Sequence, residues 1–275
     1  MHIPFLRRLG AIAMCSIVMA ACTSNPSKDV AEEEQPLSPA AIHKIALIRV
    51  LNPVELTAEN RGGPLPLLGA VGWIAQRHIN ANRGQFLEQV FRNQAFLPGD
   101  ELTNALLAEL RDKGYSIEYL RTVPRDLEDP SDILFDAIQT DADAFLVVEL
   151  DEMGIYSGVT STKFMPRLNV DVELLGRIDQ SEVFSQSIEY GVDADEHNDE
   201  EIPADPKYAY GSFGEAVEHQ TDLIEGFRRG IGAIAASIVR QLRERGVDAG
   251  PVPAITAGLS GHAAHDDGQA SNDSP

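Results

Sequence analysis

Cysteine is nearly absent from this sequence. The chain has 275 residues, and its only two cysteines, Cys15 and Cys22, both lie within the first 22. The rest of the chain therefore has no disulfide bond and no thiolate that could bind a metal. A chain of this length can bury enough apolar surface to fold without such cross-links.

Basic residues are also scarce. There are 22 lysines and arginines against 43 aspartates and glutamates, which gives a formal net charge of −21. Such a surface repels phosphate backbones, so nucleic acid is excluded as a partner.

Familiar catalytic motifs are missing as well. The sequence has no Gly-x-Ser-x-Gly elbow and no His-Glu-x-x-His metal motif. Glu215, His219 and Asp222 would share one face of a helix as an acid–base cluster, but ordinary exposed helix polarity explains them equally well. The acidic segment 193–201 lacks the glycine of a calcium loop, so we expect a solvated loop. We predict no catalytic residue, no metal site and no cofactor.

The amino terminus carries the clearest pattern. Arg7 and Arg8 precede an apolar segment, 9–21, that is too short to span a membrane and is typical of a secretory signal peptide. The ending, 19–22, resembles the lipobox of bacterial lipoproteins, with Met19 where Leu is usual. This resemblance implies cleavage after residue 21 and lipid attachment to Cys22. The alternative is an ordinary signal peptide, in which Cys22 is incidental.

Two other segments are poor in large apolar residues. Residues 22–40 are rich in Ser, Pro and acidic residues, and residues 247–275 are rich in Ala, Gly, Ser and Asp. Neither can bury enough apolar area to offset the entropy of ordering, so we predict a flexible tether and a disordered tail.

Between them we predict a single α+β domain, 41–246. Five segments have the apolar runs or the alternation of strands: 44–50, 115–120, 144–150, 168–174 and 183–190. The run at 144–150 predicts a strand covered on both faces, and the last three strands form an antiparallel meander. A helix capped by Asp100 separates the first two strands, and a short helix at 133–140 follows the second. The class is therefore a mixed sheet of about five strands.

A long helix, 213–245, closes this domain. Its apolar residues recur at steps of mostly three and four, and small residues such as Gly226 and Gly230 would let it approach the sheet closely. The predicted stripe consists of Ile224, Phe227, Ile231, Ile234, Ile238 and Leu242.

The insertion at 56–99 is the hardest part to interpret. Its apolar residues include Leu65 as well as Leu67, Leu68, Val71 and Trp73. The last four are our candidate partner-binding residues, although burial in the core is a competing interpretation.

The order of elements, with the segments 44–48, 102–110, 114–115 and 141–148, resembles a group of bacterial envelope lipoproteins. These are the curli-secretion lipoprotein family, the lipoprotein activators of penicillin-binding proteins and the amino-terminal domain of TolB. The resemblance covers residues 44–190 and implies a non-enzymatic adaptor, lipid-anchored at the periplasmic face of the outer membrane, that binds another envelope protein. The alternative is a periplasmic hydrolase with carboxylate chemistry, which would need two facing carboxylates in a deep pocket. The oligomeric state is left open.

Overall fold

The computed structural model describes residues 38–39, 42–53, 55–60, 69–129, 131–158, 163–191 and 200–247, apart from the side chains of 71–73. The predicted signal peptide, nearly all of the tether and the tail from residue 248 onward lie outside these residues. So does most of the acidic segment 193–201.

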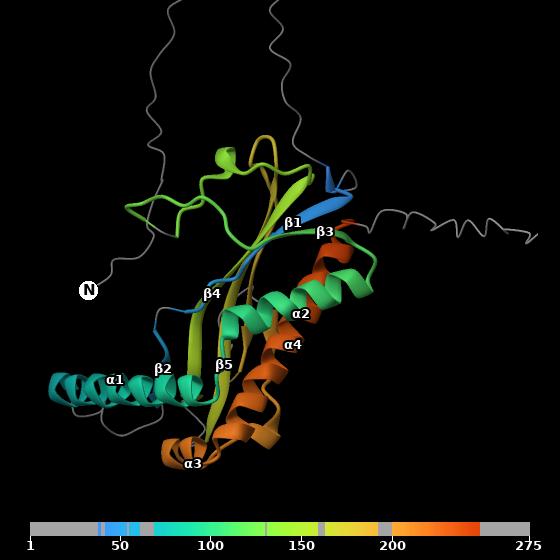
Figure 1. Cartoon of the computed structure of the whole chain (residues 1–275). Helices are drawn as coiled ribbons and strands as arrows, with labels where there is room; N and C mark the ends of the chain where they lie inside the picture. Colours follow the sequence, from blue (N-terminus) through green and yellow to red (C-terminus); the bar gives the residue numbers. More distant parts are fainter. Residues whose placement is uncertain are drawn as a thin grey trace, which may run out of the picture. The chain divides into compact units, whose positions relative to one another are not determined.

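Seven strands form one mixed sheet, which confirms the predicted α+β class (Figure 1). The strand order is β3-β1-β4-β5-β6-β7, and β2 also pairs with β4. The strands β3, β1 and β4 are parallel, whereas β4, β5 and β6 form the predicted antiparallel meander. Their bounds are β1 Lys44–Ile48, β2 Thr57–Asn60, β3 Ser116–Leu120, β4 Ala144–Ser157, β5 Phe164–Gly176, β6 Glu182–Tyr190 and β7 Glu200–Ile202.

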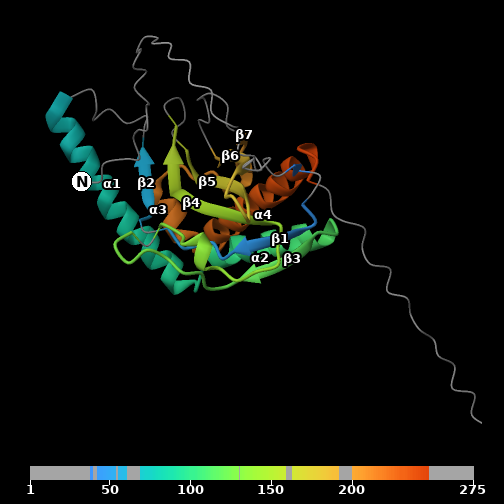
Figure 2. The same cartoon turned by 90° about the horizontal axis from the view of Figure 1, so that it is seen from above.

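Among the described residues, four helices and two short 3-10 turns accompany the sheet. Helices α2 and α4 lie side by side over one face, and α1 runs past the end of the sheet that carries β2 (Figures 1 and 2). Their bounds are α1 Gly69–Asn93, α2 Pro98–Asp112, α3 Phe213–Glu218 and α4 Gln220–Glu244, and the turns are η3 Phe135–Ala137 and η4 Pro206–Tyr208.

Strand β4 is the centre of the fold, as its apolar run predicted. Its first five residues are all buried, because helices cover one face and the segment after β3 covers the other. The smaller cluster on this second face packs Ile133, Phe135 and Ile138 against Phe145 and Val147. All six residues of the predicted α4 stripe are buried in the larger cluster on the helical face.

The carboxyl ends of α2 and α4 are built alike and meet. Gly114 and Gly246 have φ of +85° and +81°, and each follows the last turn of its helix in a position that favours glycine. The next residues, Tyr115 and Val247, bond back to Leu110 and Leu242 through their N–H groups at 3.0 Å. The Tyr115 hydroxyl also donates to the carbonyl of Val247. Val247 is fully buried.

Three predicted elements are corrected. Helix α2 begins at Pro98 rather than after a cap at Asp100, because proline needs no amide partner in a first turn and the Asn52 Oδ1 accepts the Gly99 N–H at 2.9 Å. The predicted helix at 133–140 is only the turn η3. The predicted helix at 213–245 is two helices, which are interrupted at His219.

The described part of the insertion at 56–99 forms regular structure. It contains β2, which adds to the sheet, and the 25-residue helix α1. Gly84 of α1 lies so close to the chain before β2 that an added Cβ would be 2.3 Å from the carbonyl oxygen of Leu56. Strands β2 and β7 raise the strand number from the predicted five to seven.

Candidate functional site

The first half of α1 lies beside β2 but buries no side chain among the described residues. From Ile74 to Asn82 no side chain is buried, and the first buried residue among the described part of the helix is Gly84. Figures 1 and 2 show this half extending beyond the sheet. Helix α1 therefore presents an exposed surface rather than a packed one.

The second half of α1 is firmly attached. The ring of Phe91 makes edge-to-face contacts with Phe96 and Phe227, with centroids 4.9 and 5.1 Å apart. Leu87 and Val90 are buried beside it. This aromatic contact fixes the direction in which the exposed half projects.

Three large apolar side chains on α1 face solvent. Ile74 is 64% exposed, Ile79 37% and Phe86 61%. The helix is also basic, with three arginines and one histidine against the single acid Glu88. We call Ile74, Arg77, Ile79 and Phe86 the α1 surface.

Arg83 marks the point where the exposed half of α1 meets the body. Its guanidinium lies over the rings of Phe164 and Phe213, 5.5 and 5.4 Å from their centroids. Burial lowers the pKa of Arg83, and its Nη1 is buried without a hydrogen-bond partner among the described residues. Stacking on the two rings therefore holds this cation in place where hydrogen bonds do not.

The candidate residues from the sequence fall only partly within the described chain. Val71 and Trp73 lie in the first two turns of α1, next to the α1 surface. Their side chains are not among those that the structure describes. Leu67, Leu68 and Cys22 also lie outside it. Their predicted roles stay predictions, whereas Ile74, Ile79 and Phe86 were missed because their exposure depends on how far α1 extends past the sheet.

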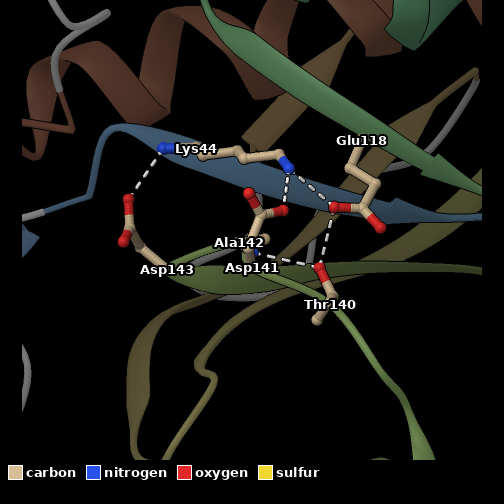
Figure 3. A network of polar contacts seen from close by, with 6 residues as sticks. All are labelled: Lys44, Glu118, Thr140, Asp141, Ala142 and Asp143. Atoms are coloured by element: carbon tan, nitrogen blue, oxygen red, sulfur yellow. Dashed lines mark hydrogen bonds and ion pairs between the residues drawn. The ribbon is translucent and has the colours of Figure 1, made fainter.

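A charged network joins the amino ends of the three parallel strands (Figure 3). The ammonium group of Lys44 pairs with Asp141 and, at 2.8 Å, with Glu118. The carboxylate of Asp143 accepts the backbone N–H groups of His43 and Lys44, both at 2.8 Å. The hydrogen bonds that Lys44 donates to Asp141 and Glu118 raise the pKa of Lys44. Since ligands of such sheets bind at the carboxyl ends of the strands, this cluster is structural.

Carboxylates gather on the face of the meander that no helix covers. Glu149 of β4 lies opposite Asp171 of β5, and Glu173 is two residues further along β5. Burial, followed by the charge of Glu173, raises the pKa of Glu149, and burial followed by Glu182 raises that of Glu173. These groups lie on a sheet surface, where Glu149 and Asp171 are exposed.

The single helix that would carry the suggested acid–base cluster does not form, because it is interrupted at His219. Glu215 instead closes the start of α3, where its carboxylate accepts the N–H of Gly211 at 2.7 Å and its own N–H donates to Ser212 at 3.1 Å. Among the described residues, no three His, Cys, Asp or Glu side chains are grouped so that they could hold a metal. None of the described helices is both long and apolar enough to cross a membrane.

No protein-family model matches the sequence, and no curated protein matches it. Three solved structures show a distant likeness. A protein of Xanthomonas campestris from family DUF330 is 10% identical, with a TM-score of 0.40 over 77% of this chain and 90% of that one. A lipoprotein of Neisseria meningitidis is 12% identical, with a TM-score of 0.29 over 74% and 99%. A putative neuraminyllactose-binding hemagglutinin homolog of Helicobacter pylori is 12% identical, with a TM-score of 0.34 over 77% and 93%. Similarity this low transfers no function, and the resemblance to the three lipoprotein groups stays a prediction.

Proposed function

We propose that this protein is a lipid-anchored adaptor at the periplasmic face of the outer membrane and that the α1 surface binds another envelope protein. The observation that supports this function is the exposed half of α1, which carries Ile74 and Ile79 into solvent. Exposed large apolar side chains are found at many interaction sites.

The composition of this half of α1 favours a partner. An isolated helix of fewer than about 12–15 residues is only marginally stable in water. Residues 69–82 include Gly72, Asn80 and Asn82, which all have low helix propensity. Contact with a partner would bury side chains that the body of this protein leaves exposed.

Charge selects the kind of partner. Helix α1 has three arginines against one glutamate, in a chain whose net charge is −21. An acidic partner would be repelled by most of the surface and attracted by α1, so electrostatics would direct it to this helix. The proposed partner is therefore an envelope protein that presents acidic and apolar side chains together.

The anchor in this proposal is Cys22, which follows a short apolar signal and two small residues. Acyl chains bind bilayers at about 0.8 kcal/mol per buried methylene, so two or three chains hold a protein firmly. Thr23 replaces the aspartate that would signal retention in the inner membrane, which favours the outer membrane.

Site-specific photo-crosslinking in intact cells tests the adaptor function. A photoreactive phenylalanine at Ile74 should give one adduct with an envelope protein, and the same residue at Ile178 should not. Ile178 is a matched control, since it is also an isoleucine and is 71% exposed. Arg77→Glu should remove the adduct, and reversing an acidic residue on the partner should restore it.

Three outcomes would contradict the proposal. These are equal adducts at the two positions, an adduct only with a second copy of this chain, and an adduct only with lipid. The alternative of a hydrolase would need two facing carboxylates inside a deep pocket, whereas Asp171, which lies opposite Glu149, is exposed on the sheet.

A further inference from the structure

A small cavity opens at the carboxyl end of β1. Its volume is about 170 Å³, enough for five or six water molecules at about 30 Å³ each. It is lined by the chain that leaves β1, by the middle of β4 and by the segment between β3 and β4. Its polar lining residues include Arg49, Arg125, Ser131 and Glu149.

The pairing of the strands creates this cavity. Strand β5 occupies one edge of β4 along its whole length, so β1 and β2 must share the other edge. There β1 pairs with residues 144–146 and β2 with residues 154–157. Between them, from 147 to 153, no described strand pairs with this edge. A β-bulge interrupts β4 between Leu150 and Glu152, and bulges are common beside active sites.

The cavity also lies where successive connections between strands change from one face of the sheet to the other. The connection from β1 to β3 includes α2 on one face, and the connection from β3 to β4 packs on the opposite face. Because β3 and β4 flank β1, the two connections leave a crevice at the carboxyl end of β1. In open sheets with parallel strands, ligands bind in such a crevice.

The polar groups of the cavity are already held in place. Arg49 donates from Nε and Nη2 to Asp100 at 2.9 and 2.7 Å. Arg125 donates from Nη1 to the carbonyl of Ser131 at 3.2 Å. A guanidinium has five N–H donors, so each arginine can bind an oxyanion in addition to the partners that it already has. Arg125 and Glu149 line the same cavity. The positive charge of Arg125 lowers the pKa of Glu149 and so acts against the effect of burial.

We propose that this cavity binds a small molecule whose carboxylate or phosphate group contacts Arg49 and Arg125 and whose hydrogen-bond donor contacts Glu149. Arginine is suited to both oxyanions because its planar fork can donate two parallel hydrogen bonds. The volume limits the ligand to less than drug size, since pockets for drug-sized molecules begin at about 300 Å³. This site lies apart from the α1 surface and does not depend on the adaptor function.

Calorimetric titration of the purified full chain tests the site, with inorganic phosphate, acetate and glycine as probes. At least one probe should bind saturably, and Arg125→Gln should weaken it by about tenfold or more, the effect of one charge-assisted hydrogen bond. Arg111→Gln removes the same charge from an exposed position on α2 and should leave binding unchanged. Arg49→Gln is the second test variant if Arg125→Gln does not fold.

The probes also identify the ligand class. Tighter binding of phosphate would indicate a phosphate ester, and tighter binding of acetate or glycine a carboxylate. Glycine should bind more tightly than acetate, because its ammonium group can donate to Glu149. The proposal is wrong if no probe saturates the site at about 10 mM, a concentration well above a dissociation constant of about 1 mM. It is also wrong if Arg111→Gln weakens binding as much as Arg125→Gln.

Discussion

At the scale of single residues, two glycines of α4 have opposite surroundings. A Cβ added to Gly230 would lie 2.6 Å from Leu168 Cδ1 and 2.7 Å from Tyr190 Cδ1, whereas one added to Gly232 meets nothing within 4 Å. The sequence predicted that Gly230 faces the sheet, and the structure confirms it. Gly230 thus permits close packing, whereas Gly232 only lowers the helix propensity of α4.

Alanine should therefore have opposite effects at the two positions. We expect Gly230→Ala to destabilise the protein by about 1–3 kcal/mol through overpacking. Gly232→Ala should stabilise it by up to about 1 kcal/mol. Urea denaturation with a common m-value measures both, and a stable Gly230→Ala variant would mean that the sheet can move away from α4.

Glu149 makes stability depend on pH. Because the pKa of Glu149 is raised by burial and by Glu173, the folded state keeps this proton to a higher pH than the unfolded chain does. Stability therefore falls as pH rises from the unfolded pKa to the folded pKa, and it stays reduced at neutral pH.

Glu149→Gln should raise the melting temperature at about pH 7 and lose this advantage near pH 3, below the ordinary carboxyl pKa. Thermal melts across this range test the prediction. The control is Glu128→Gln, which removes the same charge from an exposed loop. A gain that is equal at both pH values, or equal in the control, would rule out the titration of Glu149 as the cause.

At the scale of elements, the attached half of α1 contains two phenylalanines, one buried and one exposed. Phe91→Ala should cost about 3–5 kcal/mol, since this ring contacts Phe96 and Phe227 and is only 5% exposed. Phe86→Ala should change stability by less than about 0.5 kcal/mol, because its ring is 61% exposed. Chemical denaturation compares them, and similar losses would show that the Phe86 ring packs on the protein.

The elements that the sequence predicted well are those whose pattern is local. In β5, Leu168, Val170 and Val172 are buried, while Asp171 and Glu173 are exposed, as their alternation predicted. The stripe of α4 was equally clear.

Elements whose position depends on distant partners were not predicted. Strands β2 and β7 are only four and three residues long and exist because β4 and β6 offer free edges. Arg49 and Arg125 come together only because β3 and β4 flank β1, so no spacing in the sequence identifies their cavity. The interruption at His219 was not predicted either, because the helical pattern of the sequence continues through it.

At the scale of the whole molecule, the proposed anchor determines where the protein resides. Cys22→Ser removes the sulfur that would carry lipid, so the variant should move from the membrane fraction to the soluble periplasmic fraction. Cell fractionation with mass spectrometry measures both the location and the lipid mass. Cys15→Ser should leave location and lipid mass unchanged, because Cys15 lies inside the proposed signal segment. A Cys22→Ser protein that is still membrane-bound and has lost no lipid mass would show that Cys22 carries no anchor.

The shared edge of β4 has a consequence for folding kinetics. Strands β4, β5 and β6 follow one another closely along the chain, whereas Lys44 bonds to Asp143 across 99 residues. Closing so long a loop costs more entropy than forming the meander, so β1 should join an edge that already exists. The contact between Lys44 and Asp143 would then form after the rate-limiting step. Weakening it would leave refolding almost as fast and make unfolding faster, so this contact governs the lifetime of the folded protein rather than its rate of formation.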